Sequence, residues 1–342
     1  MKTKKERKKH AIRWILFTVI LSLGFFYQTG YADEVNNFSI QALDEDGNVN
    51  AQGYYHFDGQ PGEKREVSIR IYNASDVAIT VKAAVNPAST NENGIPGYLA
   101  EDTYDDSLTH RMDQLVKIDE AKRTIPALGF VTMKVVVLFP EEDWAGDILG
   151  GIRFTEEVKN ISEQTVVHEV AYTVGILLNK KDGETVENDL HLQDITTGQR
   201  NYRNFIEANI QNSAASIVRN MSVESTVTEK GGKAAIYTYD VYDLRMAPNS
   251  NFNFGIPTGE RPIKAGDYVL KMRVKADGKE YHFEENFTIA ASEARQLNQS
   301  AVNIDERTPY LSYLILGGIG LLILLIIGRW IRINGRKKAE SL

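Results

Sequence analysis

Two apolar segments bracket this chain and limit where the residues between them fold. Residues 1–10 are rich in Lys and Arg, residues 11–27 are mostly apolar, and Gly30 and Ala32 follow after a short polar stretch. A basic region, a short apolar region and small residues at the −3 and −1 positions of a cleavage site are typical of a signal peptide. We therefore predict export and removal of residues 1–32, rather than an uncleaved N-terminal anchor.

The second apolar segment, residues 311–327, contains no charged residue and is followed by five Lys or Arg residues up to position 338. A sortase substrate would carry Leu-Pro-x-Thr-Gly before such a segment, whereas residues 305–310 read Asp-Glu-Arg-Thr-Pro-Tyr. We predict a transmembrane helix over 310–333, with Arg329 snorkelling, and a cytoplasmic tail over 334–342. Residues 33–309 then lie outside the cell membrane.

The exported part is acidic, although the whole chain has a net charge of only −7. Residues 1–32 hold seven Lys or Arg and one Glu, and residues 310–342 hold five and one, so residues 33–309 keep 27 of 39 basic and 44 of 46 acidic residues. This excess argues against nucleic acid and anionic lipid headgroups as partners. It is compatible with glycans, with cations or with a basic protein, and it also serves solubility.

The chain contains no Cys, so its exported domains are held by hydrophobic cores alone. An exported protein without disulfides fits a bacterial surface that lacks an oxidising folding compartment. We expect the Asn-x-Ser/Thr sequences of the chain to carry no glycan in that setting.

Short β-branched or alternating stretches separated by turn residues predict an all-β fold of two tandem Ig-like β-sandwich domains. The predicted strands are 67–71, 79–83, 130–139, 166–178, 205–210, 218–228, 234–242, 268–274 and 281–289. The last two form a hairpin across Asp277 and Gly278, with Tyr268 placed as in a tyrosine corner.

These elements predict domains over 33–160 and 161–291, with polar residues 158–164 as a linker. Residues 292–309 are polar, and we expect them to form a stalk above the membrane. A helix is plausible only around 107–118.

Catalytic and metal-binding patterns are absent from the sequence. It has no thiol nucleophile, no Gly-x-Ser-x-Gly and no His-Glu-x-x-His, and its six His residues are scattered singly. Residues 44–48 are the nearest approach to a calcium loop, but Gly47 comes too early for one, and a β-turn is favoured. We expect no catalytic residue, metal or cofactor, although the many carboxylates leave a glycan hydrolase open.

Two stretches are more specific than simple packing requires. Residues 86–98 form a polar loop in which Asn91, Asn93 and Tyr98 are candidate binding residues, because amides and a Tyr suit polar ligands such as glycans. Residues 143–155 contain Gly150 and Gly151 inside a strand-like run, which favours a close backbone approach or a bulge over a binding role.

The same stretches carry a family resemblance that spans nearly the whole exported part. The chain resembles the WxL-interacting proteins of Gram-positive bacteria in both halves. The motifs are 37–38, 55–57, 61–62, 73–75, 88–94 with Tyr98, 147–152, 188–190, 208–212, 246–250 and 264–268. Each motif alone is weak, and the combination is specific.

The resemblance implies a non-enzymatic, membrane-anchored scaffold in the wall of a Gram-positive bacterium. Its first domain, 33–160, would bind peptidoglycan, and its second, 161–291, would bind a partner or a host ligand. The whole would form surface complexes with WxL-domain cell-wall proteins. The resemblance supplies no binding residues. Two alternatives stay open, which are an adhesin for a host matrix protein or glycan and a cell-wall glycan hydrolase.

Overall fold

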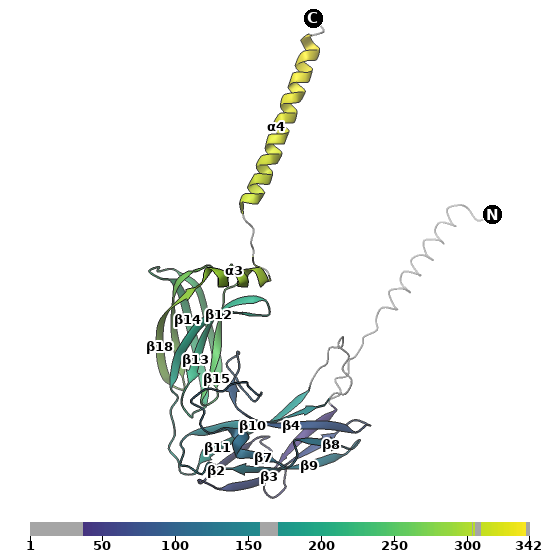
Figure 1. Cartoon of the computed structure of the whole chain (residues 1–342), viewed down its shortest axis with the longest axis vertical. Helices are drawn as coiled ribbons and strands as arrows, with labels where there is room; N and C mark the ends of the chain where they lie inside the picture. Colours follow the sequence, from purple (N-terminus) through teal and green to yellow (C-terminus); the bar gives the residue numbers. More distant parts are fainter. Residues whose placement is uncertain (1–36, 158–169, 303, 305–308, 340–342) are drawn as a thin grey trace, which may run out of the picture.

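The computed structural model describes residues 37–157, 170–302, 304 and 309–339, with the side chains of residues 314–329 in the last helix. The predicted signal peptide and the linker candidate 158–164 lie outside these residues. The described chain is mainly β-strand and forms two sandwiches, which meet in an L-shaped arrangement (Figure 1).

The first sandwich contains two sheets. One sheet has the order β1 (Phe38–Leu43), β3 (Lys64–Asn73), β9 (Phe130–Leu138) and β7 (Val116–Ile118). The other has the order β2 (Tyr55–Gly59), β11 (Ala171–Lys180), β10 (Asp147–Glu156), β4 (Ile79–Pro87) and β8 (Lys122–Ile125). All the pairs are antiparallel except β2 with β11, which are parallel.

Alternation along the strands explains this core. Val67, Ile69 and Ile71 of β3 are buried, while the residues between them face outward, so one face of the strand is apolar. Ile69 lies opposite Met133 of β9, which is also fully buried. The predicted strand at 67–71 is therefore present, and its inward face is the one that the pattern indicates.

Strand β11 lies beyond the predicted domain boundary at residue 160, yet it belongs to the first sandwich. It pairs with β2 on one side and with β10 on the other. Its Val174, Ile176 and Leu178 are buried in the first core. The first sandwich is therefore complete only when the chain reaches Lys180.

The second sandwich is built from seven strands. One sheet has the order β12 (Leu190–Arg200), β13 (Arg203–Asn212) and β16 (Ser250–Pro257). The other has the order β15 (Ala235–Met246), β14 (Val218–Glu229), β17 (Gly266–Ala276) and β18 (Lys279–Ile289). The predicted final hairpin is present, and the Tyr268 hydroxyl donates to the Lys264 carbonyl at 2.8 Å, as expected of a tyrosine corner.

Part of the predicted stalk is a helix that packs on the second sandwich. Helix α3 (Ala291–Ser300) buries Ala294 in the second core. The Asn298 side chain of α3 accepts from the amide of Ile263 at 2.9 Å and donates to the carbonyl of Ile263 at 2.8 Å. Residues 291–300 therefore belong to the second domain rather than to an extended spacer.

Two further helices complete the fold. The helix expected around 107–118 is reduced to α2 (Met112–Leu115), because residues 116–118 form the edge strand β7. Helix α4 (Pro309–Ala339) extends away from both sandwiches (Figure 1). Within the described residues, no helix has both the length and the apolar character needed to cross a membrane.

Candidate functional site

The loop predicted to bind a ligand is held between the two sandwiches. Strands β5 (Ser89–Thr90) and β6 (Pro96–Gly97) form a small hairpin that reaches from the first sandwich to the side of β15 and β16 (Figure 1). The Thr90 hydroxyl lies 2.6 Å from that of Ser250 and accepts from the amide of Ala247 at 3.0 Å. Thr90 and Ser250 are both buried, so the hairpin is part of the junction between the domains.

The structure places the three candidate residues in different surroundings. The Asn91 side-chain oxygen accepts from the amides of Asn93 and Ile95, at 2.9 and 3.3 Å, so this side chain shapes the turn. Asn93 is exposed and lines a cavity of about 680 Å³ beside Arg200 and Phe254 of the second sandwich. Tyr98 lies in a separate groove.

We call this second depression the Tyr98 groove. It has a volume of about 590 Å³ and lies between the domains. Its lining includes Tyr54, Ile95, Tyr98, Leu149, Arg219 and Arg245. Tyr54 and Ile95 are 45% and 50% exposed, so aromatic and aliphatic surface is open to a ligand.

Two glycines on neighbouring strands make room for the Tyr98 ring. Gly151 of β10 and Gly175 of β11 are paired across the sheet. A Cβ at Gly151 would lie 3.1 Å from Tyr98 Cδ1, and one at Gly175 would lie 3.3 Å from the Tyr98 hydroxyl. The close approach predicted for this glycine run is therefore present, and the partner is the candidate residue Tyr98.

The charge of the Tyr98 groove is one-sided. Arg219 and Arg245, both from the second sandwich, are the charged residues among the described groups that line it. No ion pair between described residues involves either guanidinium, and the Arg219 Nη1 donates only to the carbonyl of Ile217 at 3.3 Å. Burial raises the pKa of the Tyr98 hydroxyl.

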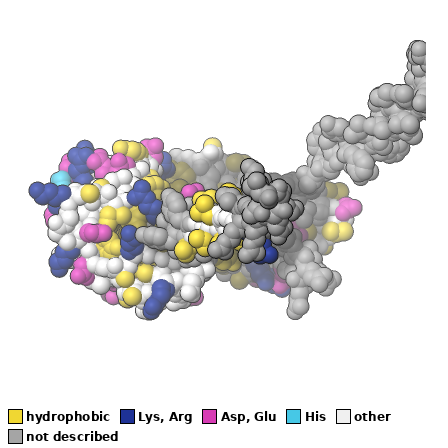
Figure 2. Space-filling view, turned by 90° about the horizontal axis from the view of Figure 1, so that it is seen from above, with side chains coloured by type: hydrophobic (Ala, Val, Ile, Leu, Met, Phe, Trp, Pro, Cys, Tyr) yellow, Lys and Arg dark blue, Asp and Glu magenta, His cyan; other side chains and the backbone are white. Residues whose placement is uncertain are grey.

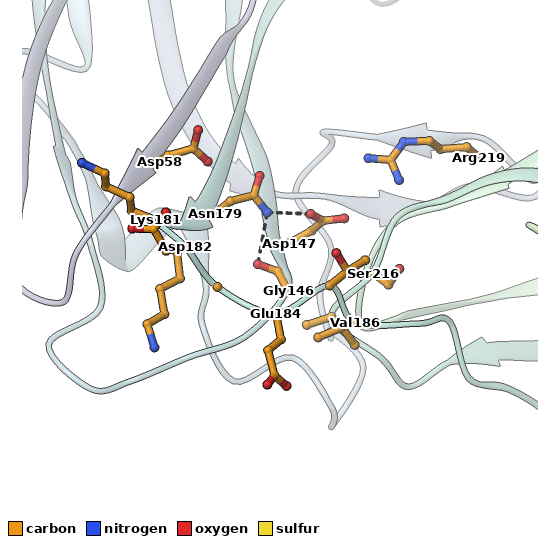
Figure 3. Close-up of a pocket in the computed structure, with 14 residues that line it drawn as sticks. Asp58, Gly146, Asp147, Asn179, Lys181, Asp182, Glu184, Val186, Ser216 and Arg219 are labelled. Atoms are coloured by element: carbon orange, nitrogen blue, oxygen red, sulfur yellow. Dashed lines mark hydrogen bonds between the residues drawn. The ribbon is translucent and has the colours of Figure 1, made fainter.

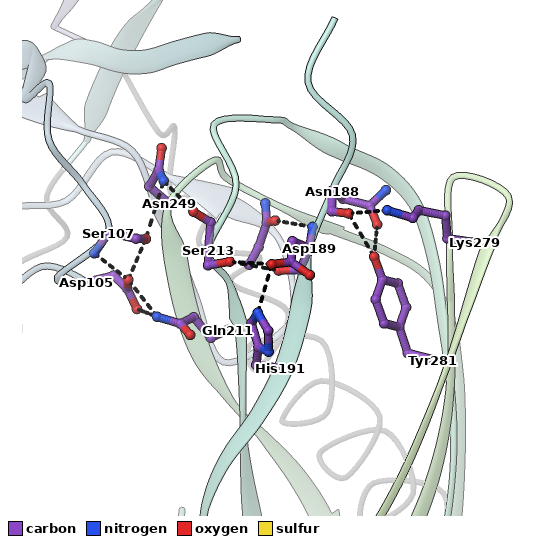
Figure 4. A network of polar contacts seen from close by, with 11 residues as sticks. Asp105, Ser107, Asn188, Asp189, His191, Gln211, Ser213, Asn249, Lys279 and Tyr281 are labelled. Carbon is purple, nitrogen blue, oxygen red and sulfur yellow. Dashed lines mark hydrogen bonds and ion pairs between the residues drawn. The ribbon is translucent and has the colours of Figure 1, made fainter. Parts of the chain in front are cut away.

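A polar network fixes the second sandwich against the first. The Asp105 carboxylate accepts from the Gln211 side chain at 2.9 and 3.0 Å and from Asn251 at 2.6 Å. Beside it, Asn249 donates to the Ser107 hydroxyl at 3.3 Å (Figure 4). Burial raises the pKa of Asp105, but hydrogen bonds from Ser107, Asn251 and Gln211 outweigh it and leave the pKa below its usual value.

A second set of contacts lies beside a polar pocket of about 570 Å³. Asn179 donates to Asp147 at 2.7 Å and to the carbonyl of Gly146 at 3.2 Å (Figure 3). The other Asp147 oxygen accepts from the amide of Ile217 at 2.9 Å. A Cβ at Gly146 would lie 2.0 Å from the carbonyl oxygen of Ala215, so the two backbones touch here. These groups satisfy one another, and we assign this pocket to the junction.

Outside the groove the charges are mixed. Figure 2 shows Lys and Arg side chains interspersed with Asp and Glu side chains over the coloured part of this face. Most of the ion pairs are exposed, such as Lys271 with Glu284 and Lys64 with Glu66. Such pairs contribute little stability and mark no site.

The His residues and the calcium-like loop of the described chain lie in ordinary surface surroundings. No group of three His, Asp or Glu side chains there is arranged to hold a metal ion. His56, His191 and His282 lie beside Asp58, Asp189 and Glu280 on the surface. One Asp44 carboxylate oxygen accepts from the amides of Asp46 and Asn48, at 3.0 and 2.8 Å, which is a turn and agrees with the expectation for residues 44–48.

Of the residues that line the groove, the sequence pointed to Tyr98 and not to Tyr54, Arg219 or Arg245. The two arginines lie in strands of the other domain, more than a hundred residues along the chain. Neither has a local signal, because an exposed Arg in a strand is ordinary. Only the docking of the two sandwiches brings them to the groove.

Solved structures similar to this chain include several chaperones. The Class 5 fimbriae chaperone CfaA shows 10% identity and a TM-score of 0.30, covering 74% of this chain and 100% of its own. The E. coli chaperone DraB shows 12% identity and a TM-score of 0.28, covering 72% and 98%. The SafB chaperone with the SafA pilin of Salmonella enterica shows 11% identity and a TM-score of 0.29, covering 74% and 97%. These likenesses are too distant to support a functional argument.

No curated protein matches the chain. Two family models do match it, and they cover both sandwiches. The peptidoglycan binding domain of WxL Interacting Protein matches residues 38–156, and the host binding domain of WxL Interacting Protein matches residues 162–299. Both describe binding domains. The chain therefore belongs to the WxL Interacting Protein family.

Proposed function

We propose that the protein is a non-enzymatic surface scaffold that binds peptidoglycan through the Tyr98 groove. The supporting observation is the exposed Tyr54 beside the half-buried Tyr98, both in the domain that matches the peptidoglycan-binding model, with Gly151 and Gly175 making room for the Tyr98 ring. Aromatic rings beside a few polar groups suit glycans and their attached peptides. The sandwich beneath keeps the rings in place, so a ligand does not have to order them.

A pull-down on isolated peptidoglycan tests this proposal. We expect Tyr54→Ala and Tyr98→Ala each to reduce the bound fraction several-fold, and Tyr98→Phe to keep most of it. Tyr242→Ala is the matched control, because Tyr242 is 61% exposed on β15 and does not line the groove. Unchanged binding by both Ala variants, with the fold intact by circular dichroism, contradicts the placement. Asn91 is a poor choice for this test, because its side chain shapes the turn.

The proposal also includes a tether to the cell membrane at residues 310–333. Its support lies in the sequence, where residues 311–327 carry no charge and five basic residues follow. A tether raises the local concentration of the binding domains at the wall, so that weak affinity suffices. Fractionation of cells that express the full chain or residues 1–309 tests it, and recovery of both forms in the membrane fraction would count against a tether.

We propose WxL-domain proteins as protein partners, on the strength of the family name. Co-purification from Gram-positive cells in mild detergent, followed by identification of the bound proteins, tests this part. A host ligand is the second candidate, and the match of residues 162–299 to the host-binding model favours it. Turnover of wall glycans by the purified protein would overturn the scaffold in favour of a hydrolase.

A further inference from the structure

We infer that the Tyr98 groove binds an anionic group of the cell-wall polymer, and that Arg219 and Arg245 of the second sandwich supply the charge that recognises it. This inference rests on the proposed function and extends it. The family model assigns peptidoglycan binding to residues 38–156, and neither arginine lies in that range. The site would then be composite and incomplete without the second domain.

The charge pattern is the first observation behind this inference. Residues 33–309 carry 44 acidic and 27 basic residues, yet no Asp or Glu is among the described residues that line the groove. Arg219 and Arg245 are both exposed there. Arg219 also lines the neighbouring pocket with Asp58, Asp147, Asp182 and Glu184, but neither guanidinium has an ion pair with a described residue, so the two favour an anion in the groove.

The backbone holds both arginines in position. The amide of Arg245 donates to the carbonyl of Gly94 at 2.7 Å, which ties its strand to the loop that carries Tyr98. The amide of Arg219 donates to the Asp277 carboxylate at 3.0 and 3.2 Å, and the amide of Asn220 donates to it at 2.9 Å. Asp277 therefore accepts from backbone groups, and the Arg219 guanidinium keeps most of its donors for a ligand.

The groove also defines the shape of the ligand. A guanidinium presents a planar fork of donors that matches a carboxylate or a phosphate. Tyr54, Tyr98 and Ile95 offer apolar surface next to this fork. An anion flanked by sugar faces or small alkyl groups fits both parts. Stem-peptide carboxylates of peptidoglycan and the phosphates of wall teichoic acid share this chemistry.

Calorimetry on the full-length protein in mild detergent distinguishes the two sources of the anion, the peptidoglycan carboxylates and the teichoic acid phosphates. The probes are a muropeptide with free carboxylates, the same disaccharide without peptide, and a glycerol phosphate oligomer. We expect Arg219→Ala and Arg245→Ala each to weaken binding of at least one anionic probe about tenfold, since charged hydrogen bonds are lost. The neutral disaccharide should bind equally to all variants. Wild-type binding of the anionic probe should also fall as salt rises from low to physiological concentration, and more steeply than in either variant.

Arg203→Ala is the matched control, because Arg203 is exposed on the same sandwich and lines a different cavity. It should bind every probe as the wild type does. If both groove variants bind all probes normally while Tyr54→Ala has lost peptidoglycan binding, the anion inference is wrong and the proposed function stands. If Tyr54→Ala and Tyr98→Ala also bind normally, the groove itself is the wrong site.

Discussion

Gly94 in the first sandwich and Leu244 in the second are in direct contact across the domain junction. Gly94 has a φ of 65°, and a Cβ added to it would lie 2.8 Å from Leu244 Cδ2. Only a residue without a side chain combines this backbone conformation with this approach. This contact of the junction therefore requires a glycine in the loop that leads to Tyr98.

Replacement of this glycine should loosen the junction. We expect Gly94→Ala to lower the free energy of unfolding by about 1–3 kcal/mol, because backbone strain and a steric clash add. Thermal unfolding measures the loss, and limited proteolysis near residues 181–189 reports on separation of the domains. Gly47→Ala is the control, since Gly47 has a φ of 81° and nothing within 4 Å of an added Cβ. Equal losses in the two variants would mean that the contact with Leu244 contributes nothing.

Acid should weaken the same junction through Asp105. The pKa of Asp105 is lower in the folded protein than its ordinary value. Its charged form therefore stabilises the fold above the unfolded pKa of about 3.9, and this stability is lost as pH falls through the folded pKa. Asp105→Ala should cost about 1–3 kcal/mol at pH 7 and should flatten the decline of stability below about pH 4.

Unfolding curves between pH 2.5 and 7 measure this effect. Asp106→Ala is the neighbouring control, because Asp106 is exposed and no described hydrogen bond involves its side chain. A pH profile of Asp105→Ala that parallels the wild type would show that this carboxylate has no part in the acid response.

A side chain added at Gly175, beneath the Tyr98 ring, should reduce ligand binding more than it reduces stability. Gly175→Val suits a β-strand and adds methyl groups beside Tyr54 and Tyr98. We expect peptidoglycan binding to fall several-fold, with a change in unfolding free energy within about 1 kcal/mol. Gly97→Ala in the nearby hairpin, with nothing within 4 Å, should change neither quantity. Full binding by Gly175→Val would place the ligand away from Gly175.

Helix α3 should behave as part of the second domain. Ala294 is 5% exposed in the second core, so Ala294→Glu buries a carboxylate without a partner. We expect a loss of about 2–5 kcal/mol, measured by denaturant unfolding of the full chain. Gln296→Glu adds the same charge at an exposed position of the same helix and should leave stability within about 0.5 kcal/mol. Small losses of stability in both Ala294→Glu and Gln296→Glu would mean that residues 291–300 form a stalk after all.

The regular part of the fold was predictable from the sequence. Alternating residues such as those around Ile69 report directly on which face is buried, so strands and their inward faces follow from the pattern. The domain boundary did not follow, because polar residues after 157 resemble a linker while β11 returns to the first sandwich. Helix α3 was missed because its apolar residues, Ala291, Ala294 and Leu297, are few in an otherwise polar segment.

The candidate site divides in the same way. Tyr98 and the glycine run were visible as local anomalies. Arg219 and Arg245 acquire meaning only from the docking of the sandwiches, which no local pattern encodes. The amide-rich loop suggested recognition by Asn91, and the structure adds a local role, since this side chain closes a turn.

Because β11 belongs to the first sandwich, the segment that matches the first family model is shorter than the segment that folds as the first domain. The family models part near residue 160, but a fragment that stops there leaves β2 and β10 without the strand between them. Those bare edges would be templates for a strand from another copy, with aggregation or exchange of strands as the result. Recombination between relatives must therefore keep residues 38–180 together. Residues 162–180, which match the second family model, are then exchanged along with the first domain.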